Sequence, residues 1–373
     1  PQLTVRETVL FSARLRLDAN KVKTNEERNE FCDYVLKTLE LWPLKDSLVG
    51  SAEEGGLSFE QKKRLSIAVE LAASPSIIFL DEPTTGLDAR SALLVVKLLR
   101  KIADTGRTVC CTIHQPSSSV FSLFDNLLLL KKGGHSVFFG DLGKASNKMI
   151  DYFQRHGAAP IDSGDNPANW MLRILASDID YVDAYSKSKE HKLLKRQLVE
   201  AKEDPPKELE VQFLTEFAVP TEERQRLMNK RLQTIYWRSP AYNLSRILVC
   251  LIIAFILGSV FITERRLDVL TESDARAYFA VTFLSFIIIG ILCITSVLPV
   301  MLAIRDVFYK QRASGMVDNT ALGWALGTAE KGFIVLSSAL FCLVYLSTAG
   351  TFEASIRRSI KFWGFFTFNL AIY

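Results

Sequence analysis

The chain has 373 residues, enough for two domains, and 49% of them are hydrophobic while 23% are charged. The charges are unevenly spread, because residues 1–240 hold 34 Lys/Arg and 33 Asp/Glu whereas residues 241–373 hold only 11 and 8. A water-soluble half therefore precedes a lipid-soluble half, which argues against a purely soluble enzyme. The net charge of +4 is too small for this length to suggest nucleic-acid binding.

Neither the cysteines nor the chain ends carry a secretory pattern. The six cysteines have no paired spacing, which predicts reduced, buried thiols in a protein that faces the cytosol. The N-terminus has no initiator Met and no signal peptide, and the C-terminus stops inside an apolar run. We therefore expect a fragment of a longer chain.

Two helices are predicted in the first quarter of the sequence. The first spans residues 24–41 and opens on a capping-box spacing. The second is amphipathic, spans residues 59–73, and is capped by Ser58 with Gln61 three residues on. Since a helix N-terminus attracts phosphate, Ser58 and Gln61 are candidate phosphate contacts, although capping alone also explains them.

Two apolar strands come next, and polar residues follow each of them. Residues 76–80 end in Asp81 and Glu82, and residues 108–113 precede His114. Buried parallel strands are continuous apolar runs, and ligands gather at their carboxyl ends. Asp81 suits Mg²⁺, which takes hard oxygen ligands, and Glu82 suits the orientation and deprotonation of an attacking water. A charged turn after a strand and a structural histidine are the plainer alternatives.

The second half holds apolar segments of transmembrane length, which is roughly 20 residues. We predict spans at 244–262, 278–304 and 329–350, and a fourth segment at 362–373. Buried core helices are the alternative, but three such runs in one half of the chain argue against it. Basic residues before the first span favour a cytoplasmic N-terminal side.

Polar residues mark the borders of this half. Residues 176–225 predict a charged linker, and residues 227–237 predict an amphipathic helix at the membrane surface. Glu330 and Lys331 form either a functional polar pair within the membrane or neighbours at its interface. We favour the interface.

The soluble motifs resemble those of a known family. Three segments resemble the signature loop, the Walker B and D-loop segment and the switch histidine of an ABC-transporter nucleotide-binding domain: Leu57–Gln61, Ile77–Asp88 and His114–Pro116. The order of the domains resembles the G subfamily, as do His114–Phe121 and Asn166–Leu172. Three further segments resemble the second half of a full-length pleiotropic-drug-resistance transporter: residues 1–17, 236–240 and 305–309.

The sequence departs from this family in three places. It contains neither the Walker A loop, G-x-x-x-x-G-K-[ST], nor the glutamine of the Q-loop. The family places both before the segment that starts at Pro1, so truncation explains both. The signature has Phe59 and Glu60 in place of two glycines, which puts a carboxylate where backbone N–H groups would approach a phosphate.

The resemblance implies an incomplete α/β ATPase domain of the P-loop NTPase (ABC) type, followed by an all-α transmembrane domain of the ABC-2 type. We expect residues 1–175 to form the partial nucleotide-binding domain and residues 176–240 a linker with a connecting helix. Residues 241–373 would hold about three and a half spans.

The resemblance also implies an activity, which is ATP-driven export of amphipathic xenobiotics or lipids with ATP and Mg²⁺ as cofactors. The expected partners are the other half of the transporter, with the first nucleotide-binding and transmembrane domains, and the lipid bilayer. Glu82 and His114 would be catalytic, and Asp81 would hold Mg²⁺. The expected ATP-binding residues are Asp81, Asp88, Ser58, Gln61 and Glu60. Ser58, Glu60 and Gln61 would face the second ATP site, where Glu60 disfavours hydrolysis.

Two other classes remain open from the residues. A soluble ABC ATPase shares the motifs, but the predicted spans count against it. A catalytically inactive, membrane-bound regulator or scaffold is the second, and the intact Asp81–Glu82 pair counts against it. The expected location is a multi-pass protein of the plasma membrane with its ATPase domain in the cytoplasm.

Overall fold

The computed structural model describes residues 2–17, 22, 24–50, 55–203, 215–260, 271–349 and 356–371. The chain divides into two compact units. One, here called the helical unit, comprises residues 1–29, 47–56 and 215–373. The other, the mixed unit, comprises residues 30–46 and 57–214.

The mixed unit alternates helices with short strands. The helices are α2 (Asn25–Thr38, whose first residues belong to the helical unit), α3 (Phe59–Leu71), α4 (Ala89–Ala103), α5 (Ser118–Phe121), α6 (Asn147–Arg155), α7 (Pro167–Leu175), α8 (Tyr181–Lys187) and α9 (Lys189–Glu203). The strands are β1 (Ile77–Leu80), β2 (Thr108–Cys111), β3 (Asn126–Lys131) and β4 (His135–Asp141). Two 3₁₀ turns complete it, η1 (Trp42–Leu44) and η2 (Lys144–Ser146).

Strands β1 and β2 pair in parallel, with Ile77 opposite Thr108 and Leu80 opposite Cys111. Both predicted strands are thus present, but the expectation that β1 is buried is wrong for part of it. Ile78 is buried, whereas Phe79 is 78% exposed. Among the described residues this sheet contains β1 and β2 alone, so side chains that alternate along β1 leave one apolar face uncovered.

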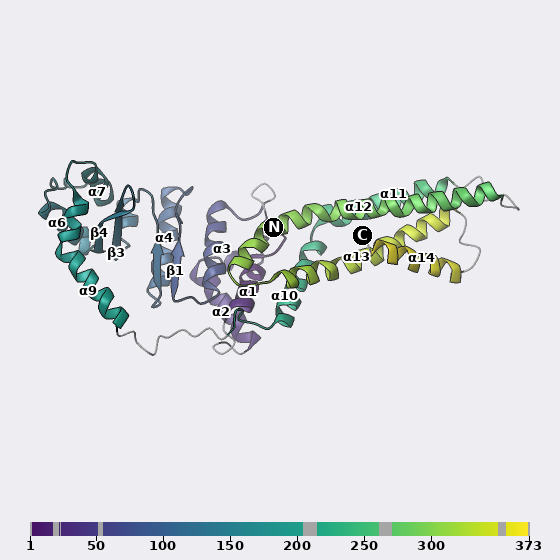
Figure 1. Cartoon of the computed structure of the whole chain (residues 1–373), viewed down its shortest axis with the longest axis horizontal. Coiled ribbons are helices and arrows are strands. Elements are labelled where there is room, and N and C mark those ends of the chain that lie inside the picture. The colour runs from purple at the N-terminus through teal and green to yellow at the C-terminus, as the bar shows by residue number, and fades with distance from the viewer. Residues whose placement is uncertain are drawn as a thin grey trace. The chain divides into compact units, whose positions relative to one another are not determined.

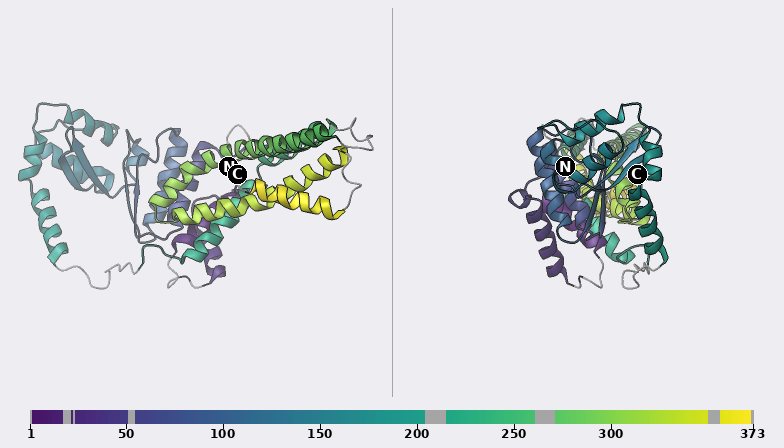
Figure 2. Two further views of the ribbon diagram at one scale, coloured as in Figure 1. Left: turned by 45° about the vertical axis from the view of Figure 1, so that its right-hand side comes forward. Right: turned by 90° about the vertical axis from the view of Figure 1, so that its left-hand side faces the viewer.

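One hydrophobic core cluster of the mixed unit gathers around strands β3 and β4, which pair as an antiparallel hairpin. Tyr152 and Phe153 of α6 meet ring to ring there, with centroids 5.0 Å apart, and Trp170 of α7 packs on Phe153. Figure 2 shows this hairpin in teal beside the helices of the same unit. Tyr181 extends the core beyond residue 175, while the predicted domain boundary there stays a prediction.

Over its described residues, the secondary structure of the helical unit consists of helices joined by turns and loops, with one isolated β-bridge between Thr4 and Leu48. Its helices are α1 (Val5–Arg16), α10 (Thr221–Trp237), α11 (Pro240–Ser259), α12 (Glu272–Ala313), α13 (Asn319–Ala349) and α14 (Ile356–Leu370). Helix α13 packs against α10, α11 and α14, and α11 also packs against α12. Figure 1 shows α1 in purple, α10 and α11 in teal to green, and α12, α13 and α14 in green to yellow.

Three helices of this unit are long and apolar enough to cross a membrane, over residues 242–259, 275–313 and 319–348. They correspond to the three full spans that the sequence predicts, although residues 261–262 and 350 lie outside the described residues. Helix α14, the fourth predicted segment, has 15 residues. The amphipathic helix predicted over 227–237 lies within α10.

All six cysteines are free thiols, as their spacing predicts. Four of them are buried, namely Cys32, Cys250, Cys293 and Cys342. The expectation of burial is wrong for Cys110, which is exposed because it shares the uncovered face of the β1–β2 sheet with Phe79.

Candidate functional site

The parallel pairing of β1 and β2 brings Asp81 and Thr112 together, because each is the first residue after its strand. The Thr112 hydroxyl donates to Asp81 Oδ1 at 2.7 Å and accepts from the backbone N–H of Glu82 at 2.9 Å. The Thr112 side chain therefore fixes both the Asp81 carboxylate and the backbone N–H of Glu82. Sequence reasoning missed Thr112, because the strand was predicted to run to Ile113 and Thr112 was therefore placed inside it.

Glu82 is held in an unusual backbone conformation. Its φ is +45°, in the left-handed region that a residue with a Cβ rarely occupies at a cost of about 1–3 kcal/mol. Its side chain accepts a hydrogen bond from the Thr85 hydroxyl at 2.9 Å, and its carbonyl accepts one from Lys63 Nζ at 3.0 Å. The carboxylate is thus oriented by a neighbour three residues on, while α3 holds the backbone.

Helix α3 begins as the sequence predicts. The backbone N–H of Gln61 donates to Ser58 Oγ at 3.2 Å, and the N–H of Ser58 donates to Gln61 Oε1 at 2.9 Å, which is a complete capping box. Both side chains are therefore engaged in capping. The Ser58 hydroxyl proton and the Gln61 amide protons are still available to a ligand at this helix N-terminus.

The Glu60 side chain points along α3 toward Arg64 and away from the N-terminus of the helix. It forms an ion pair with Arg64 Nε at 3.1 Å, and these side chains are 23% and 8% exposed. Arg64 Nη1 also donates to the carbonyls of Leu39 and Glu40, each at 3.1 Å. The Glu60 charge is therefore compensated within the mixed unit, which the sequence did not suggest.

Phe59, the other replacement in the signature, lies against Gly86. A Cβ added at Gly86 would stand 3.0 Å from Phe59 Cε1, and the φ of Gly86 is +79°. The backbone angle therefore favours glycine at this position, and an added Cβ would also displace the Phe59 ring. The start of α3 and the loop after β1 are coupled by this contact and by the bond from Lys63.

Asp88 and His114 lie on exposed loops. Asp88 is the N-cap residue of α4, where a hydrogen bond from the Ser91 hydroxyl, outweighing desolvation, lowers the pKa of the Asp88 carboxyl. His114 is exposed and follows the end of β2 by three residues, because β2 stops at Cys111 rather than at Ile113 as predicted. The structure thus brings Asp81, Glu82 and Thr112 into contact and leaves His114 two residues along from Thr112.

This edge fits one side of a Mg²⁺–nucleotide site. Oδ1 of Asp81 is engaged by Thr112, which fixes the carboxylate and leaves Oδ2 as a hard oxygen ligand. Among the described residues there is no group of three or more His, Cys, Asp or Glu that could hold a metal ion alone. Mg²⁺ is commonly held by one or two carboxylates together with phosphate oxygens, so these residues suit an ion that arrives with its nucleotide.

A second polar cluster lies within the helical unit, between α11, α12 and α13. Arg246 Nη1 donates to Glu330 Oε2 at 2.9 Å, and the Arg246 and Glu330 side chains are only 5% and 16% exposed. The Tyr242 hydroxyl donates to Glu330 at 2.8 Å and also contacts Arg246. The partner of Glu330 is therefore a buried arginine 84 residues away and not the exposed Lys331. The expected position of Glu330 and Lys331 at the membrane interface stays a prediction.

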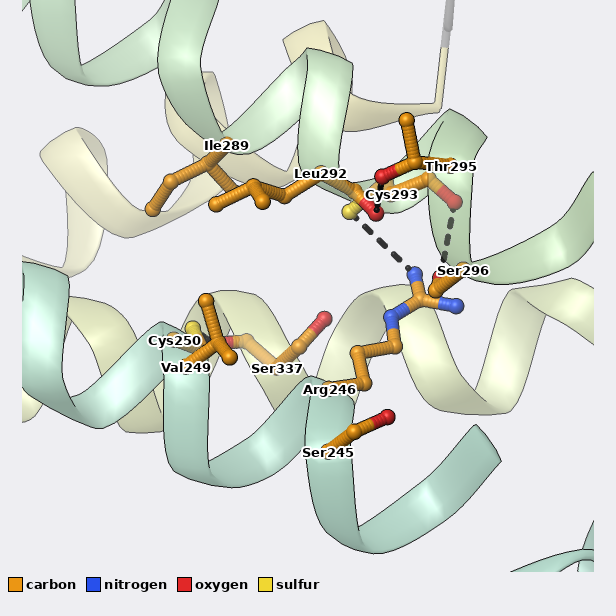
Figure 3. Close-up of a pocket in the computed structure, with 10 residues that line it drawn as sticks. All are labelled: Ser245, Arg246, Val249, Cys250, Ile289, Leu292, Cys293, Thr295, Ser296 and Ser337. Carbon is orange, nitrogen blue, oxygen red and sulfur yellow. Dashed lines mark hydrogen bonds between the residues drawn. The ribbon is translucent and has the colours of Figure 1, made fainter. Parts of the chain in front are cut away.

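Arg246 also lines a cavity of about 180 Å³ beside this cluster. Figure 3 shows Arg246 extending from α11 toward α12, where its Nη2 donates to Cys293 Sγ at 3.4 Å. The remaining wall mixes apolar side chains such as Ile289 with hydroxyls such as Ser296 and Ser337. The cavity is smaller than the roughly 300–1,000 Å³ that drug-sized ligands occupy.

Known protein-family models match segments along most of the chain. A model described as "ABC transporter" matches residues 1–85, and two models described as "ABC-2 type transporter" match residues 114–239 and 225–373. Among solved structures, a nucleotide-free ATP-binding cassette from an ABC transporter is 20% identical with a TM-score of 0.33. The match covers 48% of this chain and 64% of that one.

Curated relatives match almost the whole chain. ABC transporter G family member 31 of Arabidopsis thaliana is 38% identical over 371 residues, which is 97% of this chain and 26% of that protein. ABC transporter G family member 34 of Oryza sativa subsp. japonica is 40% identical over 385 residues, with shares of 98% and 25%. The chain spans about a quarter of the length of these relatives. It belongs to the G family of ABC transporters, in the plant pleiotropic-drug-resistance group, and comprises a partial ATPase cassette followed by ABC-2 type membrane helices.

Proposed function

We propose that this chain supplies one ATP-hydrolysing edge and part of the membrane path of an ATP-driven exporter. The observation that carries the proposal is the Asp81–Thr112–Glu82 arrangement at the carboxyl ends of β1 and β2. It occurs in a chain that also contains three helices able to span a membrane. A hydrolytic edge and membrane helices in one chain are what coupling ATP hydrolysis to transport requires.

In this proposal Glu82 is the general base. Its carboxylate, oriented by Thr85, takes a proton from the water that attacks the terminal phosphate. Asp81 holds Mg²⁺, and bound Mg²⁺ supplies neutralisation of the charge on the β- and γ-phosphates. His114, exposed at the same edge, contacts the terminal phosphate, and Asp88 lies in the loop that faces the partner domain.

The partner is the other half of the transporter, which contributes the first nucleotide-binding and transmembrane domains. The two ATPase domains pair head to tail, so that Asp81, Glu82 and His114 serve one ATP. Ser58, Glu60 and Gln61 at the start of α3 face the other. Glycine would let backbone N–H groups approach a phosphate at this helix start, but this chain has Phe59 and Glu60 there. We propose that this second site binds ATP without hydrolysing it.

The transported molecules are amphipathic xenobiotics or lipids, moved through the membrane domains of both halves. The mixed unit lies in the cytoplasm and the apolar helices lie in the plasma membrane. The basic residues that precede α11 support this orientation.

A catalytically inactive regulator or scaffold of the same family is the rival function. Its distinguishing prediction is that removal of the Glu82 carboxylate leaves transport unchanged. The strained φ of Glu82 favours the enzyme, because strain of this kind persists where a side chain must be aimed.

The proposal is tested by ATPase and transport rates of the complete transporter that contains this chain. Glu82→Gln keeps the size of the side chain but removes the base, and should lower turnover by roughly 10²–10⁴-fold. The matched control is Glu30→Gln, which makes the same change on the exposed face of α2. Residues 1–373 by themselves should show no turnover, since the sequence contains no Walker A loop. Unchanged turnover in the Glu82 variant would favour the regulator.

A further inference from the structure

A small cavity in the helical unit is lined by more basic than acidic side chains. It lies between α1 and α10 and has a volume of about 140 Å³. Its wall contains three basic side chains, Arg14, Lys230 and Arg231, and one acidic side chain, Glu7. The rest of the wall is largely apolar, with Leu10, Phe11 and Leu227 among its members.

The single carboxylate is already engaged by groups other than these three cations. Arg238 Nη1 and Nη2 donate to the two oxygens of Glu7 at 2.7 and 2.9 Å, and the backbone N–H of Thr4 donates to it at 2.9 Å. These hydrogen bonds outweigh the desolvation of Glu7 and lower the pKa of its carboxyl. Glu7 therefore compensates Arg238 rather than the cavity.

Arg231 is a partly buried cation that has no carboxylate partner within the part of the chain that the structure describes. Its guanidinium lies over the Phe11 ring, 4.3 Å from the centroid, and its other neighbour is the neutral side-chain amide of Gln311. Desolvation alone lowers the pKa of Arg231 to about 10, so the group remains charged at neutral pH. Burial of an unpaired charge is costly, and such charges are normally paired in proteins.

Arg14 adds a second guanidinium group on the same wall. Its Nε is buried and has no hydrogen-bond partner among the described residues. Lys230, the residue before Arg231 in α10, is exposed. Two guanidinium groups and one ammonium therefore surround a space of about 140 Å³. Guanidinium groups match the geometry of phosphate and carboxylate oxygens.

The position along the chain indicates where an anion would come from. Thr234 of the cavity wall precedes Tyr242, the first residue of the apolar part of α11, by eight residues. Trp237, between them, is 74% exposed, and tryptophan is enriched at membrane–water interfaces. This spacing predicts that the cavity lies near the depth of the lipid headgroups, where basic residues attract anionic phospholipids.

We propose that the cavity lined by Arg14, Lys230 and Arg231 binds the phosphate group of an anionic phospholipid from the adjoining leaflet. The cavity is too small for a transported drug-sized molecule, which needs roughly 300–1,000 Å³. It suits a charged headgroup whose acyl chains stay in the bilayer. The site concerns attachment of α1 to α10 and does not depend on the proposed hydrolysis of ATP.

The test is binding of dioctanoyl phosphatidic acid and dioctanoyl phosphatidylcholine to the purified full chain, measured by native mass spectrometry. Wild-type protein should retain phosphatidic acid in preference to phosphatidylcholine. Arg231→Gln should weaken the binding of phosphatidic acid about fivefold, and Arg14→Gln should do likewise. The matched control is Arg226→Gln, which removes the same charge from α10 at a side chain that is 83% exposed and outside the cavity.

Equal weakening by Arg226→Gln and Arg231→Gln would overturn the proposal, because it would indicate general surface attraction. Equal retention of both lipids would also overturn it. The second arm of the test is competition by inorganic phosphate. If millimolar phosphate displaces phosphatidic acid as effectively as added lipid does, the ligand is a free anion and the lipid proposal is overturned. A variant that fails to fold is recognised by its thermal unfolding. Arg14→Gln, on the other helix, then provides the test.

Discussion

The two polar clusters of this chain use the same kinds of side chain in opposite surroundings. Asp81 and Glu82 lie exposed at the end of a two-stranded sheet, held by hydroxyls and by backbone geometry. Glu330 lies buried between helices and is held by Arg246 and Tyr242. The exposed carboxylates are oriented but form no ion pair with any residue that the structure describes, as suits groups that await a cation and phosphate. The buried carboxylate is compensated within its own unit, as suits structure.

The largest predicted effect is a loss of stability when the buried Arg246–Glu330 ion pair is broken. Glu330→Ala should destabilise the helical unit by about 3–5 kcal/mol, because it leaves the Arg246 charge buried without a partner. The double variant Glu330→Leu with Arg246→Met should recover most of that loss. Thermal unfolding of the purified chain in detergent measures both.

Lys331→Ala is the control for that prediction, since Lys331 is the exposed neighbour of Glu330. A loss as large as that of Glu330→Ala would mean that the adjacent pair, rather than Arg246, is the important contact.

At the exposed cluster, Thr112→Val should lower turnover of the complete transporter about tenfold. Valine keeps the shape but removes the hydroxyl that holds Asp81 and the Glu82 backbone, and hydrogen bonds to charged groups contribute about 1.5–3 kcal/mol. Thr112 is a positioning residue in this account, so its effect should nearly vanish in a Glu82→Gln background. Additive losses in the double variant would contradict it. Thr108→Val, on the exposed start of β2, is the control.

The Glu7–Arg238 ion pair should show a smaller, pH-dependent effect. The folded-state pKa of Glu7 is lowered from 4.5, so its contribution is present above that pH and is lost as the pH falls through the folded-state value. The difference in melting temperature between wild type and Glu7→Gln should therefore shrink below about pH 4.5. Glu26→Gln, on the exposed start of α2, should show no such trend.

The smallest effect is expected for Glu60→Ala in the complete transporter. The Glu60 side chain pairs with Arg64 and not with the groups that hold Asp81 and Glu82. Turnover should therefore change far less than the roughly 10²–10⁴-fold loss expected for Glu82→Gln. Side-by-side ATPase rates for Glu60→Ala and Glu82→Gln check this. Comparable losses in the two variants would make the altered signature part of the hydrolytic cycle.

Local sequence patterns predicted the elements but not the contacts between them. The capping box of α3 depends on residues three apart, so Ser58 and Gln61 were found from spacing alone. The apolar runs likewise predicted β1, β2 and the three long helices. Thr112, 31 residues from Asp81, and Arg246, 84 residues from Glu330, were missed. Such pairs are set by strand register and helix packing, which no single window of sequence contains.

The uncovered face of the β1–β2 sheet has a practical consequence. Phe79 and Cys110 are paired in register on that face, so an accessible thiol lies beside a 78% exposed aromatic ring. Cys110 is therefore a built-in reporter of assembly that needs no engineered label. A maleimide reagent will modify it in the isolated chain, and any further strand or domain that covers the sheet will protect it.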